Sequence, residues 1–273
     1  MNLIAIIDEI EKADAESTER FSPRRKALKD FFNTGGKIAI AALPMAIGSF
    51  FTKAYGQSKV PDGIIEVLNF ALTLEHLEYR FYQKAMDTPG LLKNADNISV
   101  IRNHELEHVQ FLTKTISSVG GTPVAAAKYD FTGGGVFSDV FSNYDTFLHV
   151  AQAFEDTGVR AYKGQAGKLM RSDAILQAAL QIHSVEARHA AHIRFARRRN
   201  GYNNSVKPWI VGTDNTKGTP TEAVYAGEDN HTQVLFGTKN IGGYDIGSAA
   251  TGSFDEPLDR DDVLKIVKPF IVG

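Results

Sequence analysis

From residue 61 onward, apolar and polar positions alternate with the three- and four-residue spacing that is typical of amphipathic helices. The pattern predicts four long helices, over residues 62–87, 98–119, 143–168 and 172–199. Gly120-Gly121 is a stop signal for the second helix, and Ser172 can cap the fourth. The connections within each pair of helices are short, whereas about twenty residues join the second helix to the third. These connections are typical of an all-α four-helix bundle with a long crossover.

Charged residues interrupt the apolar stripes that should face the core of this bundle. In the second helix, Glu105 and His108 share a face with Ile101 and Leu112. An unpaired carboxylate in an apolar core costs several kcal/mol or more. Either this face is exposed to solvent, or something in the core neutralises the charge.

The four helices carry one chemical unit twice. Each copy has a Glu with a Tyr seven residues later on one helix, and Glu-x-x-His on the next helix. The members are Glu75, Tyr82, Glu105 and His108 in the first copy, and Glu155, Tyr162, Glu186 and His189 in the second. Four carboxylates and two neutral imidazoles carry four negative charges, which two divalent cations would cancel. We therefore expect the four glutamates and two histidines to be metal ligands.

A Glu from each of two helices, with Glu-x-x-His from each of the other two, resembles the ferritin-like di-iron and di-manganese carboxylate proteins. The resemblance covers residues 61–199. Within that superfamily, "LNFALTLEHLEYRFY" and the long C-terminal extension most resemble bacterial ferritin-like domain proteins related to plant desiccation-related proteins. The resemblance implies that Glu75, Glu105 and His108 hold one metal, and that Glu155, Glu186 and His189 hold the other. Glu105 and Glu186 would then bridge the two ions.

Two kinds of function are compatible with such a centre. In the first, two ions of iron or manganese bind O2 or peroxide between them, and the protein is an oxidoreductase that resembles a ferroxidase or a manganese catalase. In the second, the bundle is a non-catalytic stress- or desiccation-related envelope protein with a structural or vestigial metal site. Oxygen and nitrogen ligands do not choose strongly between iron and manganese. The chain has no cysteine, which excludes thiolate metal sites and a built-in rubredoxin-type electron donor.

Other residues near the six ligands have more than one interpretation. Tyr82 and Tyr162 either form hydrogen bonds in the core or take part in redox chemistry near the metals. His183 and His192 are each three residues from a ligand on the fourth helix. They are therefore the best candidates for side chains that contact the ligands without binding metal themselves.

The remaining polar residues of these helices are expected to be less directly involved. We expect Glu78 and Glu107 to be solvated charges on helix faces. We interpret His76, His104 and His149 as surface residues or as residues that contact the ligands without binding metal themselves.

Residues 1–56 differ in character from the rest of the chain. Arg24-Arg25 precedes an apolar run over residues 38–51, and small residues at Ala54 and Gly56 are typical of a cleavage site. The segment resembles a twin-arginine export signal, which would send the folded protein to the periplasm or cell envelope. The alternative is a helical arm retained on a cytoplasmic protein. Contact with a membrane is expected only through this segment.

Residues 200–273 are expected to form a mostly irregular extension that wraps the bundle, because residues 201–258 are rich in Gly, Thr, Asn and Asp. Asp259 can cap a final short helix over residues 260–268. The net charge of −2 gives no reason to expect a nucleic-acid partner, and a homo-oligomer is compatible with the pattern.

Overall fold

The computed structural model describes residue 60 and residues 63–214, 216–231 and 250–272. The chain divides into two units, Met1–Ile47 and Gly48–Gly273, and the described residues belong to the second unit. The predicted export signal or arm of residues 1–56 lies outside the described residues.

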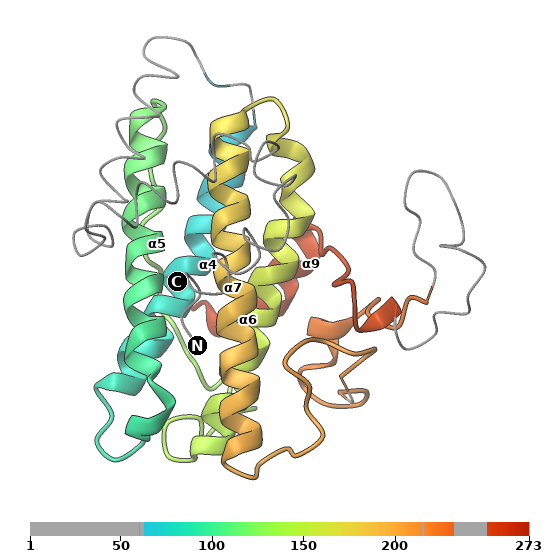
Figure 1. Cartoon of the computed structure of the whole chain (residues 1–273). Coiled ribbons are helices and arrows are strands. Elements are labelled where there is room, and N and C mark those ends of the chain that lie inside the picture. Colours follow the sequence, from blue (N-terminus) through green and yellow to red (C-terminus); the bar gives the residue numbers. More distant parts are fainter. Residues whose placement is uncertain (1–59, 61–62, 215, 232–249, 273) are drawn as a thin grey trace, which may run out of the picture. The chain divides into compact units, whose positions relative to one another are not determined.

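Four long helices form the body of the second unit. They are α4 (Ile64–Met86), α5 (Ile98–Ser118), α6 (Tyr144–Ala166) and α7 (Asp173–Arg199). Helix α4 packs along α5, α6 packs along α7, and α4 also contacts α6 (Figure 1). The described residues contain no strand, and one isolated bridge joins Tyr129 to Ile271. The predicted all-α bundle with a long crossover is confirmed, and its helix ends lie within two residues of the expected ones.

Aromatic side chains from α4, α6 and the long crossover pack against one another in the core. Phe81 of α4 is fully buried and stacks on Phe147 of α6, with the ring centroids 5.1 Å apart. Phe131 of the long crossover contacts Phe81 edge to face at 5.4 Å. The crossover therefore supplies part of the core, and its packing keeps water from the helix faces beside it.

The C-terminal extension contacts the bundle through buried arginines. Arg160 of α6 is fully buried and pairs with Glu228 at 2.7 Å. Its guanidinium also donates to backbone carbonyls of the extension, including that of Ala226 at 2.6 Å. The extension contains the short helices η4 (Glu222–Tyr225) and α9 (Arg260–Val267). Asp259 caps α9 by accepting from the Asp262 backbone N–H, as its sequence predicts.

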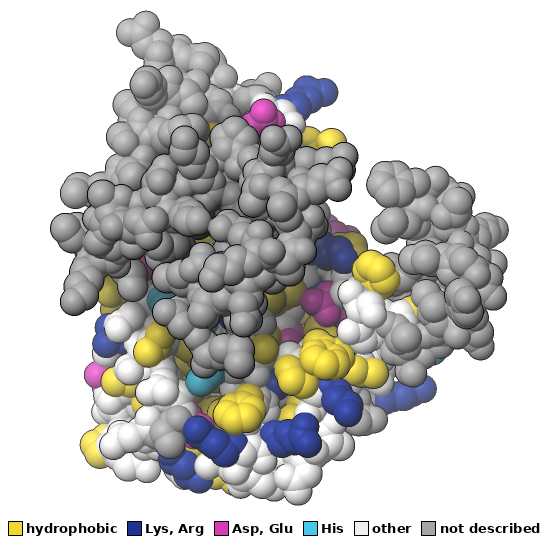
Figure 2. Space-filling view, in the orientation of Figure 1, with side chains coloured by type: hydrophobic (Ala, Val, Ile, Leu, Met, Phe, Trp, Pro, Cys, Tyr) yellow, Lys and Arg dark blue, Asp and Glu magenta, His cyan; other side chains and the backbone are white. Residues whose placement is uncertain are grey.

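Lys and Arg side chains gather at the end of the bundle where α7 ends (Figure 2). The last turn of α7 contributes Arg197, Arg198 and Arg199, and cations are favoured at the C-terminus of a helix. Arg199 also forms an ion pair with the buried Asp96.

None of the described helices has an apolar stretch long enough to cross a membrane.

Candidate metal centre

Two groups of acidic and histidine side chains meet in the middle of the bundle. Glu75, Glu105, His108 and Glu186 form the first group, and Glu105, Glu155, Glu186 and His189 form the second. Within each group, one ligand atom from every residue lies within 4.8 Å of the others. The four helices contribute one Glu each, and all four glutamates are completely buried. The structure thus brings together the six residues that the repeated sequence unit marks.

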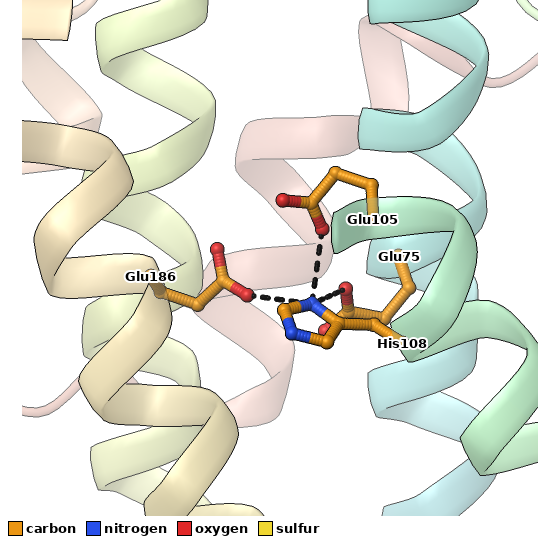
Figure 3. Close-up of side chains that lie close together, drawn as sticks. All are labelled: Glu75, Glu105, His108 and Glu186. Atoms are coloured by element: carbon orange, nitrogen blue, oxygen red, sulfur yellow. Dashed lines mark hydrogen bonds and ion pairs between the residues drawn. The ribbon is translucent and has the colours of Figure 1, made fainter. Parts of the chain in front are cut away.

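The first group converges on one nitrogen of His108 (Figure 3). His108 Nδ1 lies 3.0 Å from Glu75 Oε2, 3.2 Å from Glu105 Oε2 and 3.0 Å from Glu186 Oε1. These oxygens come from α4, α5 and α7, so three helices meet at this imidazole. One ring nitrogen carries at most one proton, which cannot satisfy three carboxylates.

The second group repeats this arrangement around His189. Its Nδ1 lies 2.8 Å from Glu105 Oε1, 3.3 Å from Glu155 Oε2 and 3.5 Å from Glu186 Oε2. Glu105 and Glu186 therefore each direct one carboxylate oxygen to the first group and the other oxygen to the second. Such a placement is what a carboxylate bridging two cations requires.

The distances within each group fit a small cation. Ligand atoms about 2.1 Å from an ion and about 90° apart lie roughly 3.0 Å from one another. Among the described residues, several buried atoms of the cluster have close polar neighbours but no hydrogen-bond partner. They are Glu105 Oε1, Glu155 Oε2, both carboxylate oxygens of Glu186, and His189 Nδ1. Buried polar atoms are normally paired, so these atoms fit residues that hold a metal ion.

Two tyrosines hold the outer oxygens of the non-bridging carboxylates. Tyr82 of α4 donates to Glu155 Oε1 of α6, and Tyr162 of α6 donates to Glu75 Oε1 of α4. Burial, followed by the nearby carboxylates, raises the pKa of both phenols, so both remain protonated donors. Each pair fixes one carboxylate oxygen and leaves the other directed at a histidine. Hydrogen bonding in the core, one of the two interpretations of these tyrosines, describes their contacts.

Burial and mutual charge shift the titration of the ligand set strongly. Burial raises the pKa of Glu75 to about 8 and that of Glu155 well above its usual range. Burial alone would also raise the pKa of Glu105, but the interactions with His108 and His189 outweigh it and lower this pKa. Metal binding would replace the protons that such a cluster otherwise needs.

His104 of α5 is the histidine that forms a hydrogen bond with one of the clustered histidines. His104 Nδ1 lies 2.9 Å from His189 Nε2, and the two rings stack with centroids 5.2 Å apart. If His189 Nδ1 faces an ion, its Nε2–H donates to His104, which fixes the tautomer of the ligand. His192 instead bonds the backbone carbonyl of Asp96 at 2.6 Å.

His183, the other histidine expected to contact a ligand, forms no hydrogen bond to the six clustered side chains among the described residues. His183 is half-buried, and its Nδ1 has no hydrogen-bond partner in the part of the chain that the structure describes. The three-residue spacing places His183 about one turn before Glu186, toward the N-terminal end of α7.

The expectation that Glu78 is a solvated charge is wrong. Glu78 of α4 is only 3% exposed, whereas Glu107 of α5 is exposed as expected. Burial, followed by the charges of Glu186 and Glu155, raises the pKa of Glu78 well above its usual range. The signal in the sequence is its place three residues after Glu75, on a neighbouring part of the same helix face.

The comparisons with known proteins agree with this architecture. A family model described as "Ferritin-like domain" matches residues 63–199, which is half of the chain. A search of curated proteins finds no match to the chain. The matched range contains the four long helices and all six clustered side chains. The chain therefore belongs to the ferritin-like domain family.

Proposed function

We propose that this protein binds two ions of iron or manganese in its bundle and uses them for redox chemistry on O2 or peroxide. The supporting observation is the placement of Glu105 and Glu186, whose two oxygens each face different histidines. Glu75 and His108 would complete the first ion site. Glu155 and His189 are the corresponding ligands of the second.

The side chains around the ions have separate tasks in this proposal. When bound, the ions supply two electrons and a Lewis-acidic surface for a small oxygen species. Tyr82 and Tyr162 hold their protons on the phenol oxygens that contact Glu155 and Glu75. His104 orients His189, and the burial of the carboxylates excludes bulk water from the centre.

A small cavity lies next to Tyr162, which contacts one of the clustered carboxylates. This cavity of about 20 Å³ lies between the helices, and Tyr162 forms part of its wall. The other lining side chains are mainly apolar, among them Leu68, Leu112 and Ile182. None of the six clustered side chains lines this cavity, and its link to the centre is Tyr162, which donates to Glu75.

A non-catalytic envelope protein with a structural metal site is the second candidate. The observation that favours it is the closed centre, in which His108 is the most exposed ligand and its side chain is only 12% exposed. In that case the protein binds its ions and turns over no peroxide or O2.

Elemental analysis followed by turnover on the same sample tests both candidates. The protein is loaded with Fe²⁺ or Mn²⁺, freed of excess metal and assayed with peroxide and O2. We expect two ions per chain, and a double variant Glu105→Ala/Glu186→Ala that retains none. Glu107→Ala, an exposed Glu on the same helix as Glu105, is the matched control.

The outcomes separate the alternatives. Two bound ions with turnover support the enzyme, and two bound ions without turnover support the structural protein. Retained stoichiometric binding in the double variant would place the ligands elsewhere in the chain.

We also propose that residues 1–56 direct the protein to the periplasm or cell envelope, the alternative being a retained arm on a cytoplasmic protein. The support is the sequence pattern around Arg24-Arg25 and the apolar run that follows it. N-terminal sequencing of protein from fractionated cells tests this, because export would give a chain shortened near residue 57. Size-exclusion chromatography of the same samples would show whether the protein forms a homo-oligomer.

A further inference from the structure

The two halves of the centre differ at one position. Glu75 of α4 and Glu155 of α6 correspond to each other in the repeated unit. Three residues later, α4 has Glu78 whereas α6 has Gly158. The repeat is therefore symmetric in its six ligands and asymmetric in this fifth carboxylate.

Gly158 leaves the space that the carboxylate of Glu78 uses. A Cβ atom on Gly158 would lie 3.3 Å from Glu78 Oε1, and 3.7 Å and 3.8 Å from Cγ and Oε2 of Glu186. The first distance is tighter than ordinary van der Waals contact, so a side chain at this position would push on Glu78. The carboxylate of Glu78 thus lies beside Glu186, against the backbone of α6.

The surroundings of Glu78 contain negative charge that it cannot neutralise. The strongest charges acting on Glu78 are those of Glu186, Glu155, Glu105 and Glu75, in this order. Glu186 Oε2, which would lie 3.8 Å from a Cβ on Gly158, and Glu155 Oε2 have no hydrogen-bond partner among the described residues. Both residues belong to the group around His189. A cation in that group would attract the carboxylate of Glu78 as well.

We propose that Glu78 is an additional carboxylate ligand for the ion on the His189 side, which its carboxylate approaches through the space beside Gly158. This rests on the metal centre proposed above. The two ions are then inequivalent. The ion on the His189 side has three glutamates besides Glu78, whereas the ion on the His108 side has three and no further acid. The extra anionic oxygen makes the His189 side the tighter site.

Titration of the metal-free protein with Mn²⁺ against a competing chelator measures both affinities. We expect two ions with different affinities in the unchanged protein. Glu78→Gln, which keeps the side-chain volume, should weaken one ion by roughly 10- to 100-fold. Gly158→Ala should act in the same direction, because the new methyl group displaces Glu78. Glu107→Gln should leave both affinities unchanged.

Two further variants assign the effect to one side of the centre. Glu78→Gln should weaken the ion that remains in His108→Ala. It should leave unchanged the ion that remains in His189→Ala. The reverse pattern would overturn the proposal. The Mn²⁺ electron paramagnetic resonance spectrum of the His108→Ala protein gives a second readout, because its single remaining ion has no coupled neighbour and its signal should change with Glu78→Gln.

The outcomes keep this proposal separate from the proposed function. If the unchanged protein binds no ion, the metal centre itself is wrong. If it binds two ions and Glu78→Gln binds both with the same affinities, the centre stands and Glu78 is a protonated structural acid. Circular dichroism of each metal-free variant verifies folding, and Gly158→Ala provides the test should Glu78→Gln fail to fold.

Discussion

A bridging carboxylate should matter twice as much for metal-dependent stability as one that contacts a single ion. Glu105 lies 3.2 Å from His108 Nδ1 through one oxygen and 2.8 Å from His189 Nδ1 through the other. Glu155 approaches only His189, at 3.3 Å, and its second oxygen accepts from Tyr82. Glu105→Gln and Glu155→Gln each replace one buried carboxylate by an amide of the same size. The two variants therefore differ mainly in how many ions lose a charged ligand.

The expected magnitudes follow from binding linkage. Mutation of a residue that hydrogen-bonds to a metal ligand already lowers metal affinity by about 10- to 100-fold. Loss of a charged ligand should therefore lower the affinity by about 100-fold or more. A factor of 100 is about 2.7 kcal/mol of stabilisation for each ion at a fixed free metal concentration. Glu155→Gln should therefore lose about 2.7 kcal/mol of metal-dependent stability. Glu105→Gln should lose about 5.5 kcal/mol, because both ions are weakened.

Urea denaturation of metal-loaded and chelator-treated samples gives these numbers. For each variant, the free energy of unfolding without metal is subtracted from the value at a fixed free Mn²⁺ concentration. The subtraction removes any effect of the amide on the metal-free protein. Glu107→Gln should match the unchanged protein. Equal losses for the two variants, or the larger loss for Glu155→Gln, would refute the bridging role of Glu105.

Three further measurements address protonation, the tyrosine pairs and the buried arginines. Because burial raises the pKa of Glu75 from 4.5 to about 8, the folded metal-free protein keeps a proton that the unfolded chain has lost. Its free energy of unfolding, from urea titrations, should fall by up to about 1.4 kcal/mol per pH unit between about pH 5 and 8. Tyr82→Phe removes the donor to Glu155 and should weaken one ion about tenfold in a chelator competition. Arg194→Met removes the buried cation 2.5 Å from the carboxylate of Asp156, leaves it the hydroxyl of Tyr225 alone among the described residues, and should cost about 3–5 kcal/mol by urea denaturation.

Each of these measurements has a matched comparison. A metal-free protein whose stability rises from pH 5 to 8 would contradict the protonation of the buried acids. Tyr79→Phe, a half-buried tyrosine on the same helix as Tyr82, should leave both ions unchanged. Arg198→Met, an exposed arginine near Arg194, should change stability by less than about 0.5 kcal/mol. Equal effects of Arg194→Met and Arg198→Met would remove the buried pair as the reason.

The helices and the clustered side chains could be predicted because both depend on local spacing. Ile101, Glu105 and Leu112 fall on one face of a helix, and the structure buries all three. The same spacing places His108 beside Glu105 without any knowledge of the neighbouring helices. The repetition of the unit then shows that the helices carrying it converge.

Contacts that depend on packing between helices could not be predicted in this way. The charge of Glu78 favours exposure, and a helix stripe from Glu75 to Tyr82, spaced by four and three residues, passes through Tyr79 instead. The structure buries Glu78 and leaves Tyr79 half-buried, because α4 packs against both α5 and α6 and so buries a wider face. His104 likewise contacts His189 across two helices, 85 residues apart in the chain. Spacing along one helix contains no information about such a pair.

The crossed tyrosine pairs have a consequence for how the protein acquires metal. Tyr82 of the first helical hairpin positions a ligand of the second hairpin, and Tyr162 of the second positions a ligand of the first. Neither hairpin alone contains a complete set of ligands for either ion. The four side chains of either group therefore come together only where the two hairpins have docked, so the packing of the hairpins prepares the site before a cation could be fully surrounded.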